Sequence, residues 1–293
     1  MVHRRNQRSQ GSSVSKSEAL ICKLSISLRT FLCLTFALGL AADEPIMNMM
    51  PRWKGGWGIQ TTLEHRYESD LLLGDQVIHD GFREDVNILH LEGVYTWERA
   101  IRLTAKLPYV LYAERELPDS SGNKITQRDQ GLGDLTLALP LKKYFNLDGR
   151  SGSWTFKPTL RVPLSGEDEY EVYYGEWGTG LGLSYEFETY RMFFFLGTSG
   201  WFHHEDKPFE SHSSLDLGYK FEARGTNAAI LWESDFHYKD DDSETLLAGP
   251  ALYWNINDLN HLRLEWKHDF HDRKGVIDHG NGDAFKLSLG WVY

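Results

Sequence analysis

The sequence predicts an all-β fold, a transmembrane antiparallel β-barrel of about twelve strands with short periplasmic turns and longer extracellular loops. Three observations support this prediction. Apolar and polar residues alternate in segments of roughly ten residues, long and short connections follow one another in turn, and no apolar run after Ala42 reaches the ~20 residues of a membrane-spanning helix. We expect the barrel to occupy residues 56–293.

The first 42 residues have the features of a secretory signal peptide. A basic, Ser-rich stretch precedes the apolar run TFLCLTFALGLAA, which ends in the small residues Ala41 and Ala42. This run of about thirteen residues is too short to span a bilayer, so we expect cleavage rather than a retained anchor. Both cysteines, Cys22 and Cys33, lie in this segment, and the exported chain is therefore expected to lack disulfides.

The 293 residues carry 31 Lys+Arg against 42 Asp+Glu, a net charge of -11. This acidity argues against a nucleic-acid partner, because binding to phosphates needs a basic surface. Residues 43–55 follow the signal and contain three methionines. We expect them to form either a periplasmic lead-in or a plug inside the lumen.

Alternation of side chains assigns one face of each strand to lipid, because successive residues of a strand point to opposite sides. The stretch GTGLGLSYEFE places Thr179, Leu181 and Leu183 on one face, and Ser184 and Glu186 on the other. The segments with such an outer face are 57–63, 89–97, 101–111, 135–141, 154–162, 178–188, 215–221, 228–238, 246–254, 262–270 and 285–293, with 192–202 apolar on both faces.

The opposite face of these strands is rich in charge. In the penultimate segment, Arg263 and Glu265 alternate with Leu264. If the aliphatic face meets lipid, the charged face lines a lumen, where rings of charge select solutes. The candidate lumen and selectivity residues are Arg102, Lys106, Arg161, Glu186, Glu233, Asp235, Arg263 and Glu265.

Connection lengths favour a membrane barrel over a soluble sandwich. The long, polar connections are Ser69–Arg83, Glu116–Gln130, Ser165–Trp177, Glu205–His212, Lys239–Glu244 and His271–Asn281. Most of the others are tight, which is the layout expected of a barrel with both ends in the periplasm. Four prolines oppose the assignment unless they lie near strand ends or at bulges, since each removes a ladder hydrogen bond: Pro108, Pro140, Pro158 and Pro250.

One motif carries a family resemblance. The stretch QGLGDLTLALPLKKYF, with Gly131, Gly133 and Asp134, resembles the G-x-G-D strand start of the "MetA-pathway of phenol degradation" transporter family. The final SLGWVY is similar to the terminal aromatic strand that bacterial outer-membrane barrels present to their assembly machinery. The resemblance implies the outer membrane of a Gram-negative cell, and aromatic or hydrophobic compounds as solutes.

We therefore expect a porin-like outer-membrane channel for passive transport of small solutes, without cofactor or catalytic centre. Two alternatives remain open: a closed structural barrel, and an embedded lipid hydrolase of the phospholipase or lipid A deacylase type. The hydrolase would use His212 and Ser214, a His-x-Ser pair in SHSSLD. Both share the lumen parity of Asp216, whereas a lipid-cleaving site should open toward the bilayer.

No metal site is expected. The stretch HDFHDRKGVIDHGNGD gathers His268, His271 and Asp272 near the last long connection, but its spacing matches no compact metal site. The expected partners are the lipid bilayer, lipopolysaccharide, the barrel-assembly machinery and a small-molecule solute.

Overall fold

Alternating segments form long β-strands throughout the part of the chain that the structure describes. The computed structural model describes residues 54–293, apart from 148–149, 166–171, 205–206, 224 and 258, and these residues belong to the unit Gly39–Tyr293. The expected signal peptide and most of the segment 43–55 lie outside the described residues. Within the described part, no helix is long and apolar enough to cross a membrane.

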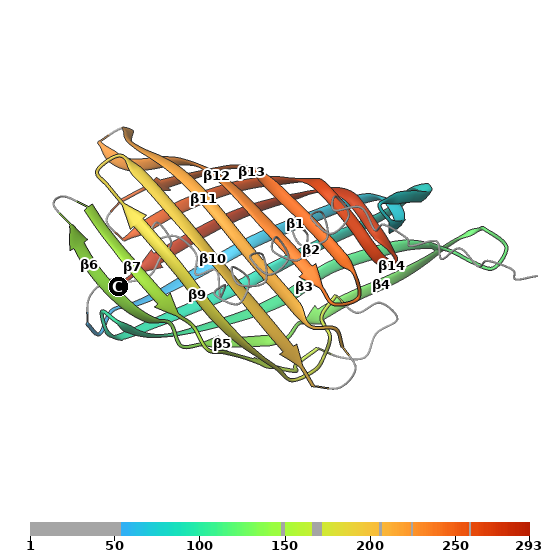
Figure 1. Cartoon of the computed structure of the whole chain (residues 1–293), viewed down its shortest axis with the longest axis horizontal. Helices are drawn as coiled ribbons and strands as arrows, with labels where there is room; N and C mark the ends of the chain where they lie inside the picture. Colours follow the sequence, from blue (N-terminus) through green and yellow to red (C-terminus); the bar gives the residue numbers. More distant parts are fainter. Residues whose placement is uncertain (1–53, 148–149, 166–171, 205–206, 224, 258) are drawn as a thin grey trace, which may run out of the picture. The chain divides into compact units, whose positions relative to one another are not determined.

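Fourteen strand elements make one antiparallel sheet (Figure 1). They are β1 (Trp57–Gly74), β2 (Gln76–Glu98), β3 (Ile101–Pro118), β4 (Lys124–Leu132), β5 (Leu135–Ala138), β6 (Leu141–Leu147), β7 (Arg150–Phe156), β8 (Thr159–Val162), β9 (Gly178–Glu188), β10 (Met192–His203), β11 (Glu210–Ala223), β12 (Thr226–Lys239), β13 (Ser243–Asn255) and β14 (Asn260–Val292).

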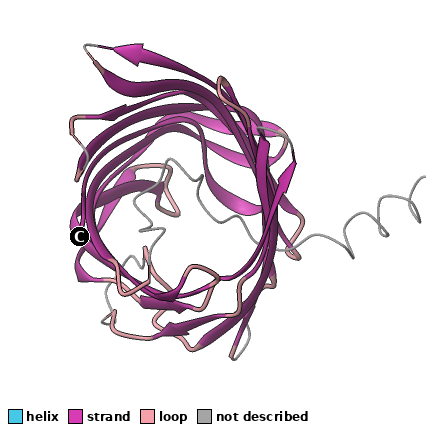
Figure 2. Cartoon of the chain, turned by 90° about the vertical axis from the view of Figure 1, so that its left-hand side faces the viewer, coloured by secondary structure: helices cyan, strands magenta, loops and turns pink. Residues whose placement is uncertain are grey.

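The sheet closes on itself, so it forms a barrel around a central lumen (Figure 2). Eleven elements complete the ring, in the order β10-β11-β12-β13-β14-β1-β2-β3-β5-β8-β9, with β9 pairing back to β10. Element β14 pairs with β13 through residues 261–273 and with β1 through residues 274–292, and thus supplies two neighbouring strands of the wall. Counted in this way the wall has twelve strands, as the sequence predicts.

Prolines interrupt two strands of the wall. Pro140 separates β5 from β6, and Pro158 separates β7 from β8. The carbonyl oxygens of these prolines still accept hydrogen bonds from backbone N–H groups, Leu139 to Pro158 at 3.0 Å and Arg102 to Pro140 at 3.3 Å. These prolines therefore break strands, as expected, whereas Pro108 remains inside β3 opposite His90.

The fourth proline also lies within a strand. Pro250 is in β13, between the β13–β14 pairs Ala248↔His268 and Ala251↔Glu265. On the other side of β13 it is paired in register with Trp232 of β12.

The outer face of the barrel is aliphatic and aromatic. Leu91 on β2 is 50% exposed and Ile230 on β12 is 55% exposed. Residues of the other parity, such as Ser184 and Glu186, are buried inside. An apolar outside around a polar inside is the reverse of a soluble sandwich and is typical of a barrel in lipid.

The first and last strands form the seam of the barrel. Trp57 and Tyr293 exchange two backbone hydrogen bonds of 2.9 and 2.7 Å, and their rings stack with centroids 4.5 Å apart. From this pair the β1–β14 ladder continues along both strands through pairs such as Gly58↔Val292 and Thr62↔Ser288.

Several strands are longer than predicted. The connections Ser69–Arg83, Glu116–Gln130 and His271–Asn281 consist mostly of strand, because β1 and β2, β3 and β4, and the arms of β14 continue as hairpins past the predicted strand ends. Their interpretation as long loops is corrected accordingly. Both faces of these extensions carry polar residues, so the alternation that marks the lipid-facing part fades there.

Candidate functional site

A cavity of about 390 Å³ occupies the middle of the lumen. Its walls come from nearly every strand of the ring and are mostly polar or charged. The charged and histidine residues that line it are Glu92, Lys106, Lys157, His212, Asp216, Glu233, Asp235, His237, Arg263, Glu265, Lys267 and Lys286. We refer to this space as the chamber.

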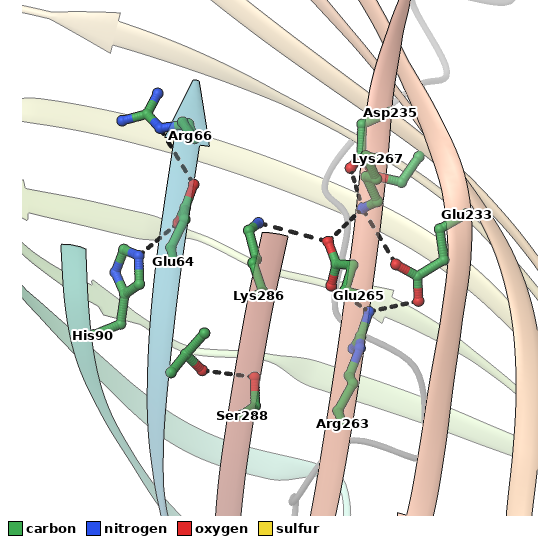
Figure 3. A network of polar contacts seen from close by, with 12 residues as sticks. Glu64, Arg66, His90, Glu233, Asp235, Arg263, Glu265, Lys267, Lys286 and Ser288 are labelled. Atoms are coloured by element: carbon green, nitrogen blue, oxygen red, sulfur yellow. Dashed lines mark hydrogen bonds and ion pairs between the residues drawn. The ribbon is translucent and has the colours of Figure 1, made fainter. Parts of the chain in front are cut away.

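A network of ion pairs covers the β12 and β14 side of the chamber (Figure 3). Lys267 Nζ lies 2.5 Å from Asp235 Oδ2, 2.9 Å from Glu265 Oε1 and 3.2 Å from Glu233 Oε2. Arg263 Nη2 lies 2.6 Å from Glu233 Oε1 and 3.3 Å from Glu265 Oε2. Strand alternation explains the grouping, because residues two apart on one strand point to the same side.

The network continues along the wall toward β1. Lys286 Nζ is 3.7 Å from Glu265 Oε1, which joins the two arms of β14. On β1, Glu64 accepts from His90 Nε2 at 2.7 Å and lies 3.4 Å from Arg66 Nε. Acidic and basic groups therefore alternate over one continuous stretch of the lumen wall (Figure 3).

An apolar cluster lies on the periplasmic side of the chamber. Phe193 and Phe195 of β10 pack with Ala229 and Leu231 of β12, and with two residues of β13. All belong to the ends of their strands nearest the short turns. This explains why the segment 192–202 is apolar on both faces: its outer residues meet lipid, and Phe193 and Phe195 on its inner face belong to this cluster.

A second apolar cluster lies on the extracellular side of the chamber. It consists of Val86 and Ile88 of β2 with Val110 and Ala113 of β3. On these strands the chamber residues Glu92 and Lys106 lie nearer the periplasmic turn. An apolar cluster therefore lies on each side of the charged chamber, one on β10, β12 and β13 and the other on β2 and β3.

The eight sequence-predicted lumen residues fall into two groups. Lys106, Glu233, Asp235, Arg263 and Glu265 line the chamber. Lys106 also pairs with Glu92 at 3.3 Å.

The other three members of the set lie elsewhere on the lumen wall. Arg102 is 2% exposed and donates to the Tyr144 hydroxyl at 2.8 Å, near the periplasmic end. Glu186 pairs with Lys142 at 2.5 Å, with both side chains nearly inaccessible. The Arg161 guanidinium lies 4.7 Å from the centre of the Trp201 ring.

The motif residues lie where β4 meets β5, not in the chamber. Gly131 has φ +131°, a backbone conformation open mainly to glycine. The Gly133 amide donates to the carbonyl oxygen of Pro108 at 3.0 Å. Asp134 is 2% exposed, and its carboxylate accepts hydrogen bonds from the connection between β8 and β9.

The pair His212 and Ser214 is not arranged as a base and a nucleophile. Ser214 Oγ donates to Asp235 Oδ1 at 2.6 Å, and the His212 ring packs against His237 with centroids 4.1 Å apart. Both His212 and Ser214 line the chamber, away from the lipid-facing surface. The geometry therefore gives no support to hydrolysis of membrane lipid at this pair.

No group of three or more His, Cys, Asp or Glu side chains is placed to hold a metal ion within the described part of the chain. His268 Nδ1 lies 3.1 Å from Asp283 Oδ1 and forms an ordinary polar contact.

The set of selectivity candidates omitted important lumen residues. Alternation places Lys267 on the charged face together with Arg263 and Glu265, and it could likewise have added Lys286. Tyr173 and Tyr174 lie in a predicted loop, where alternation carries no information. Only the structure shows that they reach the lumen wall.

A closed antiparallel barrel with an apolar outer surface and a charged interior defines the class of outer-membrane β-barrels, and the chain is a protein of the bacterial outer membrane. Residues 73–286 match the family described as "Putative MetA-pathway of phenol degradation". The chain belongs to this family, which confirms the resemblance noted in the motif. No curated protein matches the sequence.

A solved structure shows the same fold. The COG4313 outer membrane channel from Pseudomonas putida F1 superposes with a TM-score of 0.68 at 16% identity, over 86% of this chain and 100% of that chain. More distant likenesses include the KdgM porin, with a TM-score of 0.43, 8% identity and coverage of 78% and 98%. The β domain of the Bordetella autotransporter BrkA gives 0.44, 13% identity and coverage of 81% and 99%.

Proposed function

We propose that the protein is a passive outer-membrane channel that admits small solutes through the lumen of the barrel. The observation that carries the proposal is the chamber, a space of about 390 Å³ at mid-barrel with charged walls. If side chains only filled the interior of the barrel, no space of this size would be expected among charged groups. The fold of the COG4313 channel supports the same role.

The chamber favours solutes that combine an aromatic ring with a charged or polar group. Phe195 and Trp201 line it together with Arg263, Lys267 and Glu233. Rings pack on aromatic side chains, and a carboxylate or phenol oxygen can accept hydrogen bonds from guanidinium and ammonium groups. The family description, which refers to phenol degradation, points to the same solute class.

Within this proposal, the eight lumen residues named from the sequence set ion preference, since alternating acids and bases in a narrow space orient a charged solute. We also propose that residues 1–42 act as an export signal, that the assembly machinery inserts the barrel, and that lipopolysaccharide surrounds its extracellular end.

The test is single-channel conductance of the full chain, exported by its host and purified from outer membranes. Discrete ohmic steps in a planar bilayer are expected. Proteoliposomes should also release benzoate faster than a neutral sugar of similar size. Absence of conductance from a folded barrel, recognised by its heat-modifiable gel mobility, would refute the proposed channel function.

A closed structural barrel is the alternative that one observation favours. The two apolar clusters, around Phe195 and around Ile88, place apolar side chains inside the barrel on the two sides of the charged chamber. A folded barrel that neither conducts nor releases solute would support this second reading.

A further inference from the structure

A short segment between β8 and β9, Val172–Gly175, reaches two distant parts of the barrel wall. The Val172 amide donates to Asp129 Oδ2 of β4 at 2.9 Å. Val172 and Tyr173 pack on the extracellular apolar cluster of β2 and β3, which includes Ile88 and Val110. One end of the segment is thus fixed to the β2–β4 side of the barrel.

The next residue contacts a different part of the wall. The Tyr174 hydroxyl donates to Glu210 Oε1 of β11 at 2.6 Å and accepts from Lys239 Nζ of β12 at 3.0 Å. Its ring meets His203 of β10 edge-on, with centroids 5.0 Å apart. In the ring, β2 and β3 are separated from β11 and β12 by several strands in either direction, so adjacent tyrosines contact nearly opposite walls.

Asp134 clamps the flanks of this segment. Its Oδ2 accepts from the Gly175 amide at 3.1 Å, and its Oδ1 accepts from the Ser165 hydroxyl at 2.9 Å and the Leu164 amide at 3.2 Å. Hydrogen bonds to an ionised carboxylate are among the stronger ones in proteins, and Asp134 is 2% exposed. The clamp holds both flanks to the start of β5.

Gly133 leaves room for the Tyr173 ring. A Cβ atom at position 133 would lie 2.4 Å from Tyr173 Cδ2 and 2.8 Å from Cγ, closer than real Cβ contacts come. The G-x-G-D motif therefore has a physical reading in this chain: its second glycine accommodates the ring, and its aspartate fastens the flanks of the same segment.

We propose that Val172–Gly175 is a fixed crossbar that limits solute size on the extracellular side of the chamber. Tyr173 and Tyr174 are its size-determining residues, and Gly133 and Asp134 are positioning residues that hold it. This inference rests on the proposed channel function. Conductance and size limit are set by the crossbar, whereas ion preference is set by the charged residues of the lumen wall.

The experiment compares Asp134→Asn, Gly133→Ala and Tyr173→Ala in the full exported chain, each checked by heat-modifiable mobility. Unitary conductance is measured in planar bilayers, and size limit by liposome swelling with sugars of increasing length. A matched control is Asp119→Asn, because Asp119 also accepts from loop amides, Ser121 at 2.7 Å and Asn123 at 2.8 Å, but in the β3–β4 turn.

A severalfold rise in conductance and admission of larger sugars are expected in the three crossbar variants, with ion preference unchanged and Asp119→Asn like wild type. Tyr173→Ala and Gly133→Ala keep the test valid if Asp134→Asn does not fold. Wild-type conductance and size limit in folded Asp134→Asn and Tyr173→Ala would overturn the crossbar.

A second readout separates failure of the crossbar from failure of the channel. Ser214→Cys places a thiol in the chamber, and wild type, which is expected to lose Cys22 and Cys33 with its signal peptide, gives the blank. If wild type does not conduct, the channel fails, but the crossbar still predicts that a bulky thiol reagent added outside labels Ser214→Cys faster when Tyr173→Ala is also present. Equal labelling would reject the crossbar on its own.

Discussion

Lys267 is the group whose removal should disturb the lumen most. Its ammonium lies within 3.2 Å of three carboxylates, those of Asp235, Glu265 and Glu233, and its side chain is 9% exposed. Replacement by methionine keeps an unbranched side chain and removes the ammonium group with its charge and its hydrogen-bond donors. Arg263 and Lys286 then remain as the cations beside these three acids.

The magnitude follows from burial. Breaking a buried ion pair by removing one partner costs about 3–5 kcal/mol, because the other charge is left uncompensated. Glu233 and Glu265 keep their contacts with Arg263, so Lys267→Met should lower the free energy of unfolding by about 3 kcal/mol, the lower end of this range. The double variant Lys267→Met/Glu233→Gln restores the balance of charge and should recover most of the loss.

The assay is reversible denaturant unfolding in detergent micelles, followed by tryptophan fluorescence. The matched control is Lys54→Met, which removes an ion pair with Glu98 of similar length, 3.1 Å, whose side chains are 77% and 62% exposed. Exposed pairs contribute only about 0–1 kcal/mol. If Lys267→Met were no more destabilising than Lys54→Met, the network would not be the structural element described above.

Three further predictions concern selectivity, the lipid face and a loop. Neutralising Arg161 and Arg263 to Gln should shift the reversal potential under a salt gradient toward cations, and an unchanged potential would remove both from the selectivity set. Leu91→Arg puts a charge on the outer face, where Leu91 is 50% exposed, and should cost about 2–4 kcal/mol in vesicle refolding if the site lies near the midplane; a neutral result would mean that this face does not meet lipid. In the β3–β4 turn, amide hydrogen bonds from Asn123 and Ser121 hold the pKa of Asp119 below its usual range. The ionised Asp119 carboxylate stabilises the turn at pH values above the ordinary carboxyl pKa, and this stabilisation is lost as the pH falls through the lowered pKa. Asp119→Ala should therefore speed amide exchange in the turn at neutral pH and match wild type in strong acid. Equal exchange rates at neutral pH would contradict this assignment.

Period-two alternation was sufficient to predict the barrel and the inner face of its strands. In the last hairpin, Arg263 and Glu265 point into the chamber while Leu264 is 43% exposed outside, as the sequence indicates. The reason is physical: a strand between lipid and a polar lumen must alternate at every step, and a slip by one residue would bring charge into lipid.

Contacts across the lumen could not be predicted in the same way. Which residues meet depends on the stagger between strands and on the paths of the connections, and neither property leaves a periodic signal in the sequence. Tyr173 and Tyr174 lie in a predicted loop, yet they contact opposite parts of the wall. The resemblance drew attention to Gly133 and Asp134, but their role became visible only with the segment that they hold.

The seam between Trp57 and Tyr293 has a consequence for biogenesis. Thr62 and Ser288, which share a hydrogen bond of 2.9 Å across it, are 226 positions apart in the chain. Closure of the wall therefore requires strands from both extremes of the barrel at once, and contacts of such long sequence separation form slowly. Until they form, the edges of β1 and β14 expose unpaired backbone groups that lipid cannot satisfy. The chain must therefore be shielded from aggregation until its last strand arrives.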